Sequence, residues 1–479
     1  MNKLVVPETP IRIDNPAYDF FEHLTLNDRI LFSGAFGIGK TFFLREFFKI
    51  NEIKEKYNVF HLYPVNYQIA NNEDIFELIK YDILYHLFSF EWINVKVEEF
   101  SKVLAVQSYL LNNGASFFSK IMKCIPLYGI DVAGSAIETF INFRKDFYKH
   151  YEEIKSNDEK LLAIFREQIE EKKGSIYEFD TISEFIYNNL ANCNNGIAEK
   201  EKHKKNVLII DDLDRIDPEH IFRLLNIFSA HTDKGDGINK FGFDTIIFVC
   251  DVANIRSIFA AKYGQQTDFS GYIDKFYSSE IFHFNNKIAI TEFVKQLMNS
   301  NYKTKANNYY TNDEIVHIGD ILYSFVEGRA INLRNIIANV KDFKIKKEQM
   351  GFIGRYYYYS AYTIIWVCSK ILGNQKEVLI NAFRKAKLPS NILFDLTQTG
   401  IINLVLPLLI DDFTNPPINS ESTVRQNNID FKFTLRTDTT NRFPMIYANF
   451  TSAISVDFET LKIMLIEATN KLYDKGLLD

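Results

Sequence analysis

The segment Arg29-Ile-Leu-Phe-Ser-Gly-Ala-Phe-Gly-Ile-Gly-Lys-Thr41 decides the fold of this chain. Its first five residues contain the apolar run 30–32 and stop at glycine, which predicts a short buried strand over 29–33. The next eight match the pattern G-x-x-x-x-G-K-[ST], and residues 42–49 have the periodicity of a helix. A strand, this glycine-rich loop and a helix in succession predict a phosphate-binding loop, or P-loop.

The chemistry of the loop points to a bound nucleotide. Glycines permit a tight backbone whose successive N–H groups surround phosphate oxygens, and the start of the following helix favours an anion. We expect Lys40 to reach the β- and γ-phosphates of ATP and the Thr41 hydroxyl to bind Mg²⁺. The predicted nucleotide-binding residues are Gly34, Ala35, Phe36, Gly37, Ile38, Gly39, Lys40, Thr41 and Phe42. The alternative is a glycine turn without a ligand, although a chance match arises only about 2% of the time in such a chain.

A second segment, at 206–219, supplies carboxylates. Residues 207–210 form an unbroken aliphatic run, as expected of a central parallel strand covered on both faces. We expect Asp211, at the end of this strand, to hold Mg²⁺ and Asp212 to polarise the attacking water. Asp217-Pro218 then predicts the N-cap and first residue of a helix. The alternative is a strand that ends in acidic turn residues.

The run Asp211-Asp-Leu-Asp-Arg215 after an aliphatic strand resembles the Walker B signature of the KAP family of P-loop NTPases. Residues 58–67 resemble the family's second strand and aromatic turn, with Tyr63 and Tyr67 in the place of its usual tryptophan. Residues 245–251 resemble the strand before the family's polar sensor. The segments 272–276 and 280–284 resemble the part that closes the core, so the resemblance covers residues 10–345 in outline.

This resemblance implies an α/β fold with a parallel-sheet P-loop core of strand order 5-1-4-3-2. The expected strands are 29–33, 58–63, 207–211, 245–250 and 280–284. In such sheets ligands bind at the carboxyl ends of the strands, which places Asp251 near the γ-phosphate; the alternative for Asp251 is a helix cap. The implied domains are an NTPase core at 1–285 with a large helical insert at about 75–205, a helical lid at 286–350, and a mostly helical C-terminal domain at 351–479.

Arginines are expected to complete the site. Residues 327–339 predict a helix beyond the core and resemble the arginine-bearing lid helix of AAA-like and KAP ATPases. Arg329 or Arg334 is expected to contact the γ-phosphate and to couple the nucleotide to the lid. Arg215 is the other candidate finger, acting across a subunit interface. Ordinary surface or packing roles remain the alternatives for all three.

The insert and the C-terminal region carry weaker signals. The most apolar part of the insert, 117–143, is interrupted by charges and a proline, which favours a soluble helical insert over a membrane-touching hairpin. Tyr356–Tyr359 leads into a predicted buried helix at 360–367, with a base-stacking platform as the alternative. The segment 431–436 alternates in period two and is predicted to pair with 443–450, as in a winged helix.

Composition limits the function classes. The chain has 479 residues, with 55 Lys+Arg against 61 Asp+Glu, and its net charge of −6 excludes a globally basic nucleic-acid binder but leaves local patches open. Four separated cysteines without a CxxC pair, and nine histidines outside metal spacing, predict no zinc site and a reduced compartment. A proline and an acid near the start argue against a signal peptide, so we expect a cytoplasmic protein.

The sequence therefore predicts a Mg²⁺-dependent, ATP-binding and ATP-hydrolysing switch of the KAP type. Its expected partners are a nucleotide and either further copies of the chain or another protein, bound through the insert or the C-terminal domain. No motif supports a nucleic acid, and a membrane is not expected. The resemblance implies a bacterial origin and, in many members, a role in anti-phage defence. The alternatives are a nucleotide-gated scaffold without hydrolysis, a nucleic-acid-associated ATPase and a small-molecule kinase.

Overall fold

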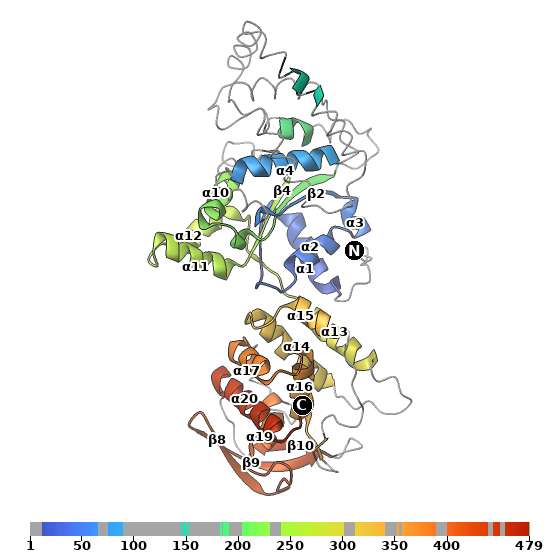
Figure 1. Ribbon diagram of the computed structural model, residues 1–479, viewed down its shortest axis with the longest axis vertical. Helices are drawn as coiled ribbons and strands as arrows, with labels where there is room; N and C mark the ends of the chain where they lie inside the picture. The colour runs from blue at the N-terminus through green and yellow to red at the C-terminus, as the bar shows by residue number, and fades with distance from the viewer. Residues whose placement is uncertain are drawn as a thin grey trace. The chain divides into compact units, whose positions relative to one another are not determined.

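The computed structural model describes residues 12–65, 75–89, 145–146, 148–150, 152, 183, 185–190, 204–229, 241–300, 312–340, 352–353, 357–388, 400–438, 444–450 and 456–478. The predictions for 117–143, Tyr67 and Tyr356 lie outside these residues. Two compact units are distinguished, and Figure 1 shows their elements. The first contains Phe20–Ser33 and Phe47–His283, and the second contains Gly34–Glu46 and Phe284–Asp479, together with the start of the first helix.

The first unit is built on a parallel five-stranded sheet. Its strands are β1 (Arg29–Ser33), β2 (Tyr57–Leu62), β3 (Lys205–Ile210), β4 (Thr245–Cys250) and β5 (Phe282–His283). Their order, β2-β3-β4-β1-β5, is the predicted order, which confirms the fold class. The register places the last residues of β1 and β4 side by side, since Ser33 lies opposite Cys250. The carboxyl ends of the strands therefore lie along one edge of the sheet.

Helices cover both faces of this sheet, because neighbouring side chains of a strand point to opposite faces. Leu31 of β1 packs in a core shared with α4 (Ile75–Ser89) and α10 (Pro218–Ser229). On the other face, the Phe32 ring lies 5.1 Å from that of Phe20 in α1 (Asp14–Leu26). Figure 1 shows α4 and α1 on opposite sides of the strands. The remaining helices that follow the strands are α2 (Lys40–Phe47), α3 (Asn51–Lys54), α11 (Val252–Tyr263) and α12 (Phe269–Ile273).

The start of α10 confirms the predicted cap. Pro218 is the first helical residue, where its missing N–H costs no hydrogen bond. The Asp217 carboxylate accepts a hydrogen bond of 2.8 Å from the backbone N–H of Glu219. The chain therefore turns from the acidic strand end into a helix, as the sequence predicts.

In the second unit, α13 (Lys287–Ser300), α14 (Asn312–Glu327) and α15 (Leu333–Val340) follow the core. The prediction of one helix over 327–339 was wrong at its start, because α14 ends at Glu327 and α15 begins only at Leu333. Gly328 packs against the backbone of Lys385, where a Cβ atom would collide. Asn332 then caps α15 by accepting a hydrogen bond of 2.8 Å from Asn335 N–H.

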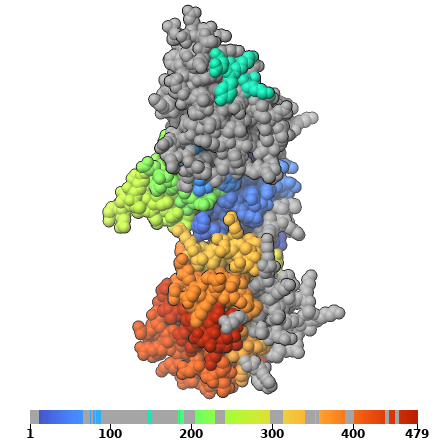
Figure 2. Space-filling model, in the orientation of Figure 1, coloured from blue at the N-terminus to red at the C-terminus, as the bar shows by residue number. Residues whose placement is uncertain are grey.

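The C-terminal part of this unit combines helices with a second sheet. Its strands are β6 (Phe352–Ile353), β7 (Tyr357–Tyr358), β8 (Glu421–Gln426), β9 (Ile429–Asp438) and β10 (Met445–Phe450), in the order β6-β7-β10-β9-β8. Antiparallel pairing of β9 with β10 confirms the predicted pairing. The helices are α16 (Ser360–Ile371), which is the predicted buried helix, α17 (Lys376–Lys385), α19 (Ile401–Leu409) and α20 (Phe458–Asp474). Figure 2 shows the orange-to-red residues of this region as one closely packed surface.

Buried and exposed side chains alternate along the strands of this sheet, so that one face of the sheet packs against helices. In β9, Phe431, Phe433 and Leu435 are buried, while Lys432 and Arg436 between and beyond them are exposed. Every residue of α19 is buried, and this helix contacts both β10 and α20. None of the described helices combines the length and the apolarity that crossing a membrane requires.

Candidate functional site

The phosphate loop starts at Gly34, one residue beyond β1, and ends where α2 begins at Lys40. Gly37 and Gly39 have φ angles of +80° and +98°, a region that side chains with a Cβ atom rarely adopt. These two glycines turn the backbone back on itself, so that α2 starts directly at the loop. The local geometry is the strand, loop and helix that the sequence predicts.

Residues before α13 and at the start of α15 hold this loop from outside. The backbone N–H of Leu333 donates a hydrogen bond of 2.9 Å to Gly37 O, and the buried Asn286 side chain donates one of 2.6 Å to Ile38 O. A Cβ atom on Gly37 would lie 2.5 Å from Asn332 Cβ. The loop is therefore fixed by contacts to α15 and to the residue before α13, none of which the sequence analysis anticipated.

Lys40 is folded onto its own loop. Its Nζ donates hydrogen bonds to Gly34 O at 2.7 Å and Ala35 O at 3.3 Å, and the residue is only 7% exposed. Thr41 and Phe42 follow in the first turn of α2 and are half-buried, whereas Phe36 is 51% exposed. The ammonium group is thus held inside the glycine loop by carbonyl oxygens, which a phosphate would replace as its partner.

In the first unit, Asp211 follows β3 and is fully buried. One carboxylate oxygen accepts a hydrogen bond of 2.7 Å from Asp212 N–H. The other lies 2.9 Å from Nε2 of His61, a residue of β2. Since an ionised carboxylate only accepts hydrogen bonds, Nε2 is the donor. Both oxygens of the predicted metal ligand are therefore oriented by the protein.

His61 is itself held in place by Tyr63. The two rings stack with their centroids 4.4 Å apart, and the Tyr63 hydroxyl lies 3.3 Å from His61 Nδ1. Sequence reasoning identified Tyr63 as part of an aromatic turn but missed His61. A signal was present, because His61 is the polar residue in the otherwise apolar run 59–62 of a strand that pairs with β3.

Asp212 adopts a left-handed conformation, with φ of 51°. Its carboxylate forms an ion pair of 2.7 Å with the Arg215 guanidinium, and its carbonyl accepts a hydrogen bond of 3.0 Å from Arg215 N–H. The structure therefore brings together Asp212 and one of the three candidate arginines. In this arrangement Arg215 neutralises the carboxylate that the sequence assigns to water activation.

Asp251 follows β4 and caps α11. Its carboxylate accepts hydrogen bonds from Ala253 N–H at 3.1 Å and Asn254 N–H at 3.3 Å. The next backbone N–H, of Val252, donates to the Ser33 hydroxyl at 3.2 Å, which ties the end of β1 to the start of α11. The helix-cap role considered for Asp251 is thus present.

Of the two other candidate arginines, Arg329 lies in the turn between α14 and α15, and Arg334 lies at the start of α15. Arg329 has a left-handed φ of 58° and is exposed. Arg334 is the second residue of α15 and is also exposed. The structure thus groups the predicted residues as two sets: the loop residues, Arg329 and Arg334 in the second unit, and Asp211, Asp212, Arg215 and Asp251 in the first.

Comparison with known protein families supports the assignment of a P-loop. The family model described as the KAP family P-loop domain matches residues 22–350, more than half of the chain. Comparison with curated proteins and with solved structures found no match. Within the matched range lie the glycine loop after β1 and the Asp211–Asp212 pair after β3. The chain is a nucleotide-binding P-loop protein and belongs to the KAP family of P-loop NTPases.

Proposed function

We propose that this protein is an ATP-binding, ATP-hydrolysing and Mg²⁺-dependent switch. The observation that carries the proposal is the glycine loop, whose left-handed Gly37 and Gly39 lead directly into α2 at Lys40. Backbone N–H groups of such a loop and the N-terminus of its helix suit a triphosphate. The buried Asp211 and the acidic residue next to it support hydrolysis rather than binding alone.

The residues have distinct roles in this proposal. Residues 34–42 bind the phosphates, with Lys40 exchanging the carbonyl oxygens of its own loop for phosphate oxygens. Thr41 and Asp211 would hold Mg²⁺, whose hard oxygen ligands suit a hydroxyl and a carboxylate. The ion would neutralise charge on the phosphates. Asp212 orients the attacking water, and Asp251 lies near the γ-phosphate.

The wider assignment follows the family resemblance. Arg329 or Arg334 contacts the γ-phosphate and thereby couples nucleotide binding to the position of a lid at 286–350. The other two domains are an NTPase core at 1–285 and a C-terminal domain at 351–479. We further propose a cytoplasmic location, assembly with further copies or a partner protein, and a role in anti-phage defence. Lid contacts to the carbonyls of Gly37 and Ile38 support the coupling of nucleotide and lid.

ATP binding and turnover by two variants test the assignment. Lys40→Ala is expected to lose both, because the phosphates lose their cation. Asp212→Asn is expected to keep binding but lose turnover, because an amide does not accept the water's proton. Glu219→Gln, a matched change at an exposed carboxylate near the same strand end, should leave both unchanged. Hydrolysis that survives both of the first two changes would remove the proposed roles.

A second candidate, a nucleotide-gated scaffold that does not hydrolyse ATP alone, is favoured by the Arg215–Asp212 ion pair. An Asp212 carboxylate held by Arg215 is a poorer proton acceptor until something draws the arginine away. Turnover measured against protein concentration, with and without DNA, separates the two candidates. A rate per chain that stays constant supports the hydrolase, whereas a rate that rises with assembly or DNA supports the gated scaffold.

A further inference from the structure

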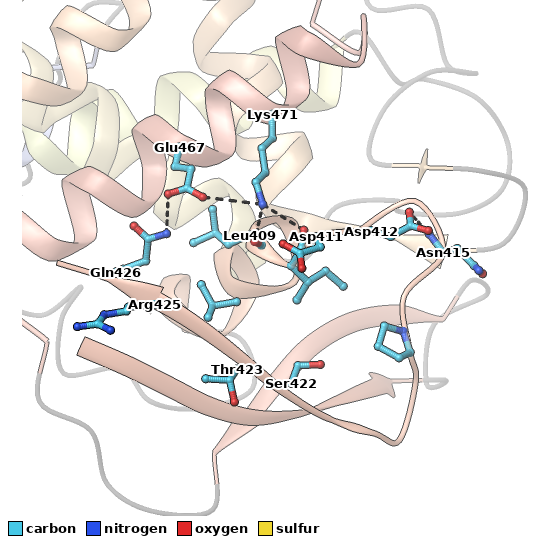
Figure 3. Close-up of a pocket in the computed structure, with 13 residues that line it drawn as sticks. Leu409, Asp411, Asp412, Asn415, Ser422, Thr423, Arg425, Gln426, Glu467 and Lys471 are labelled. Carbon is cyan, nitrogen blue, oxygen red and sulfur yellow. Dashed lines mark hydrogen bonds and ion pairs between the residues drawn. The ribbon is translucent and has the colours of Figure 1, made fainter. Parts of the chain in front are cut away.

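Strand β8 forms an open edge of the C-terminal sheet. β9 pairs with one side of it, and among the described residues no strand lies on the other side. A pocket of about 530 Å³ opens along this strand and is lined by five consecutive residues, 422–426 (Figure 3). Because neighbouring side chains of a strand point to opposite faces, lining by consecutive residues means that the pocket borders the main-chain edge.

Two charged residues that line this pocket, Lys471 and Glu467, are already paired within the chain. Lys471 donates hydrogen bonds to the carbonyl oxygens of Leu409 and, at 3.1 Å, Ile410, at the end of α19. Glu467 accepts a hydrogen bond from Gln426. Figure 3 shows this cluster around Lys471, with Thr423 of β8 pointing away from it. We therefore consider the strand edge and its outer face as the surface for a partner.

The hairpin fixes which main-chain groups reach that edge. The turn at 427–428 has two residues, both with positive φ, and places Gln426 opposite Ile429. In a two-residue hairpin, the pair next to the turn exchanges both main-chain hydrogen bonds, and pairs further along alternate. Residues 422, 424 and 426 therefore bond to β9. The N–H and C=O groups of Glu421, Thr423 and Arg425 point towards the open edge.

The side chains of these three residues form a sequence that complements itself. Glu421, Thr423 and Arg425 are all exposed on one face of β8. If a second β8 runs antiparallel about a two-fold axis at Thr423, Glu421 of each copy lies opposite Arg425 of the other. Thr423 then lies opposite itself. Opposite charges and threonine pairs stabilise such cross-strand positions, and like charges destabilise them.

We propose that β8 pairs with β8 of a second copy of this chain, centred on Thr423. The pairing joins two five-stranded sheets into one and closes the edge that each copy leaves open. The pairing provides hydrogen-bond partners for the N–H and C=O groups of Glu421, Thr423 and Arg425 that point towards the open edge. By symmetry it also forms two Glu–Arg contacts. The inference does not depend on nucleotide binding, because every residue in it belongs to the C-terminal sheet.

Charge reversal tests the pairing on the full-length protein. Sedimentation equilibrium should show a dimer for the unaltered chain. Arg425→Glu or Glu421→Arg places like charges opposite each other twice, and should weaken self-association about tenfold or more. The double change Glu421→Arg with Arg425→Glu restores opposite charges and should restore the dimer. Thermal melting checks that the hairpin, in which Arg425 lies 3.7 Å from Asp430, stays folded in each variant.

Cross-linking tests the register directly. Opposed residues that exchange main-chain hydrogen bonds have Cα atoms about 5.5 Å apart, within the range that a disulfide spans. Thr423→Cys should therefore form a covalent dimer on oxidation, above the level of the unaltered chain. Glu421→Cys is the matched control and should not, because its opposite residue is Arg425. A monomeric chain, a dimer insensitive to both single charge reversals, or equal cross-linking by the two cysteine variants would overturn the proposal.

Discussion

Replacing His61 by phenylalanine isolates the hydrogen bond from its Nε2 to Asp211. Phenylalanine keeps a ring to stack on Tyr63 but removes the donor 2.9 Å from the carboxylate. Asp211 is fully buried, where a carboxylate oxygen that loses its donor is costly. A hydrogen bond to a charged group contributes about 1.5–3 kcal/mol, and about 1.4 kcal/mol corresponds to a tenfold change in affinity. If Asp211 binds Mg²⁺, the affinity of the His61→Phe variant for Mg²⁺ should therefore be about ten- to a hundredfold lower than that of the unaltered protein.

The assay is a Mg²⁺ titration at fixed nucleotide, followed by the fluorescence of a labelled ATP analogue. His61→Gln serves as the matched control, because its amide retains an N–H donor and should recover part of the affinity. Tyr63→Phe removes only the hydroxyl 3.3 Å from His61 Nδ1 and should have a smaller effect. A folded His61→Phe protein with unchanged Mg²⁺ dependence would refute the reasoning, as would equal losses in His61→Phe and His61→Gln.

Three further predictions concern stability. Gly37→Ala combines left-handed strain with a clash against Asn332, and should lower both the melting temperature and the nucleotide affinity. The effect should exceed that of Gly373→Ala, because Gly373 has a similar φ but no atom within 4 Å of an added Cβ. Tyr358→Phe removes a 2.7 Å hydrogen bond to the buried Glu314 and should lower the free energy of unfolding in urea by about 1.5–3 kcal/mol. Burial lowers the pKa of His86 to about 4, against 6.5 in the unfolded chain. Between these two values the unfolded chain binds more protons than the folded protein, so the free energy of unfolding should rise from pH 4 to pH 6.5. The His86→Phe variant should show a smaller rise over this range.

Much of the core could be predicted because its signals are local. The predicted strands at 29–33 and 245–250, each built on an apolar run, correspond residue for residue to β1 and β4. The glycine loop needs left-handed conformations at Gly37 and Gly39, and the motif supplies glycine at both. Parallel strands read as continuous apolar segments because both faces are covered. The alternation at 431–436 likewise predicted a strand with one buried face.

The features that could not be predicted from the sequence depend on contacts between residues that are far apart in the chain. His61 and Asp211 are 150 positions apart, and only the pairing of β2 with β3 brings them together. The hydrogen bond from Asn286 to Ile38 spans 248 positions. The start of α15 was misplaced because helical periodicity continues through Gly328, whereas the close approach of Lys385 and the cap at Asn332 decide where the helix ends and resumes.

The hydrogen bonds that Leu333 and Asn286 donate to the phosphate loop have a thermodynamic consequence. Leu333 N–H and the Asn286 side chain bond to carbonyls of Gly37 and Ile38, so the shape of the loop and the position of α15 are parts of one equilibrium. Coupling of this kind is reciprocal. If a bound nucleotide raises the affinity of α15 for another molecule by some factor, that molecule raises the affinity of the loop for the nucleotide by the same factor. An effector that binds α15 can therefore change the nucleotide affinity of this protein without contacting the nucleotide itself.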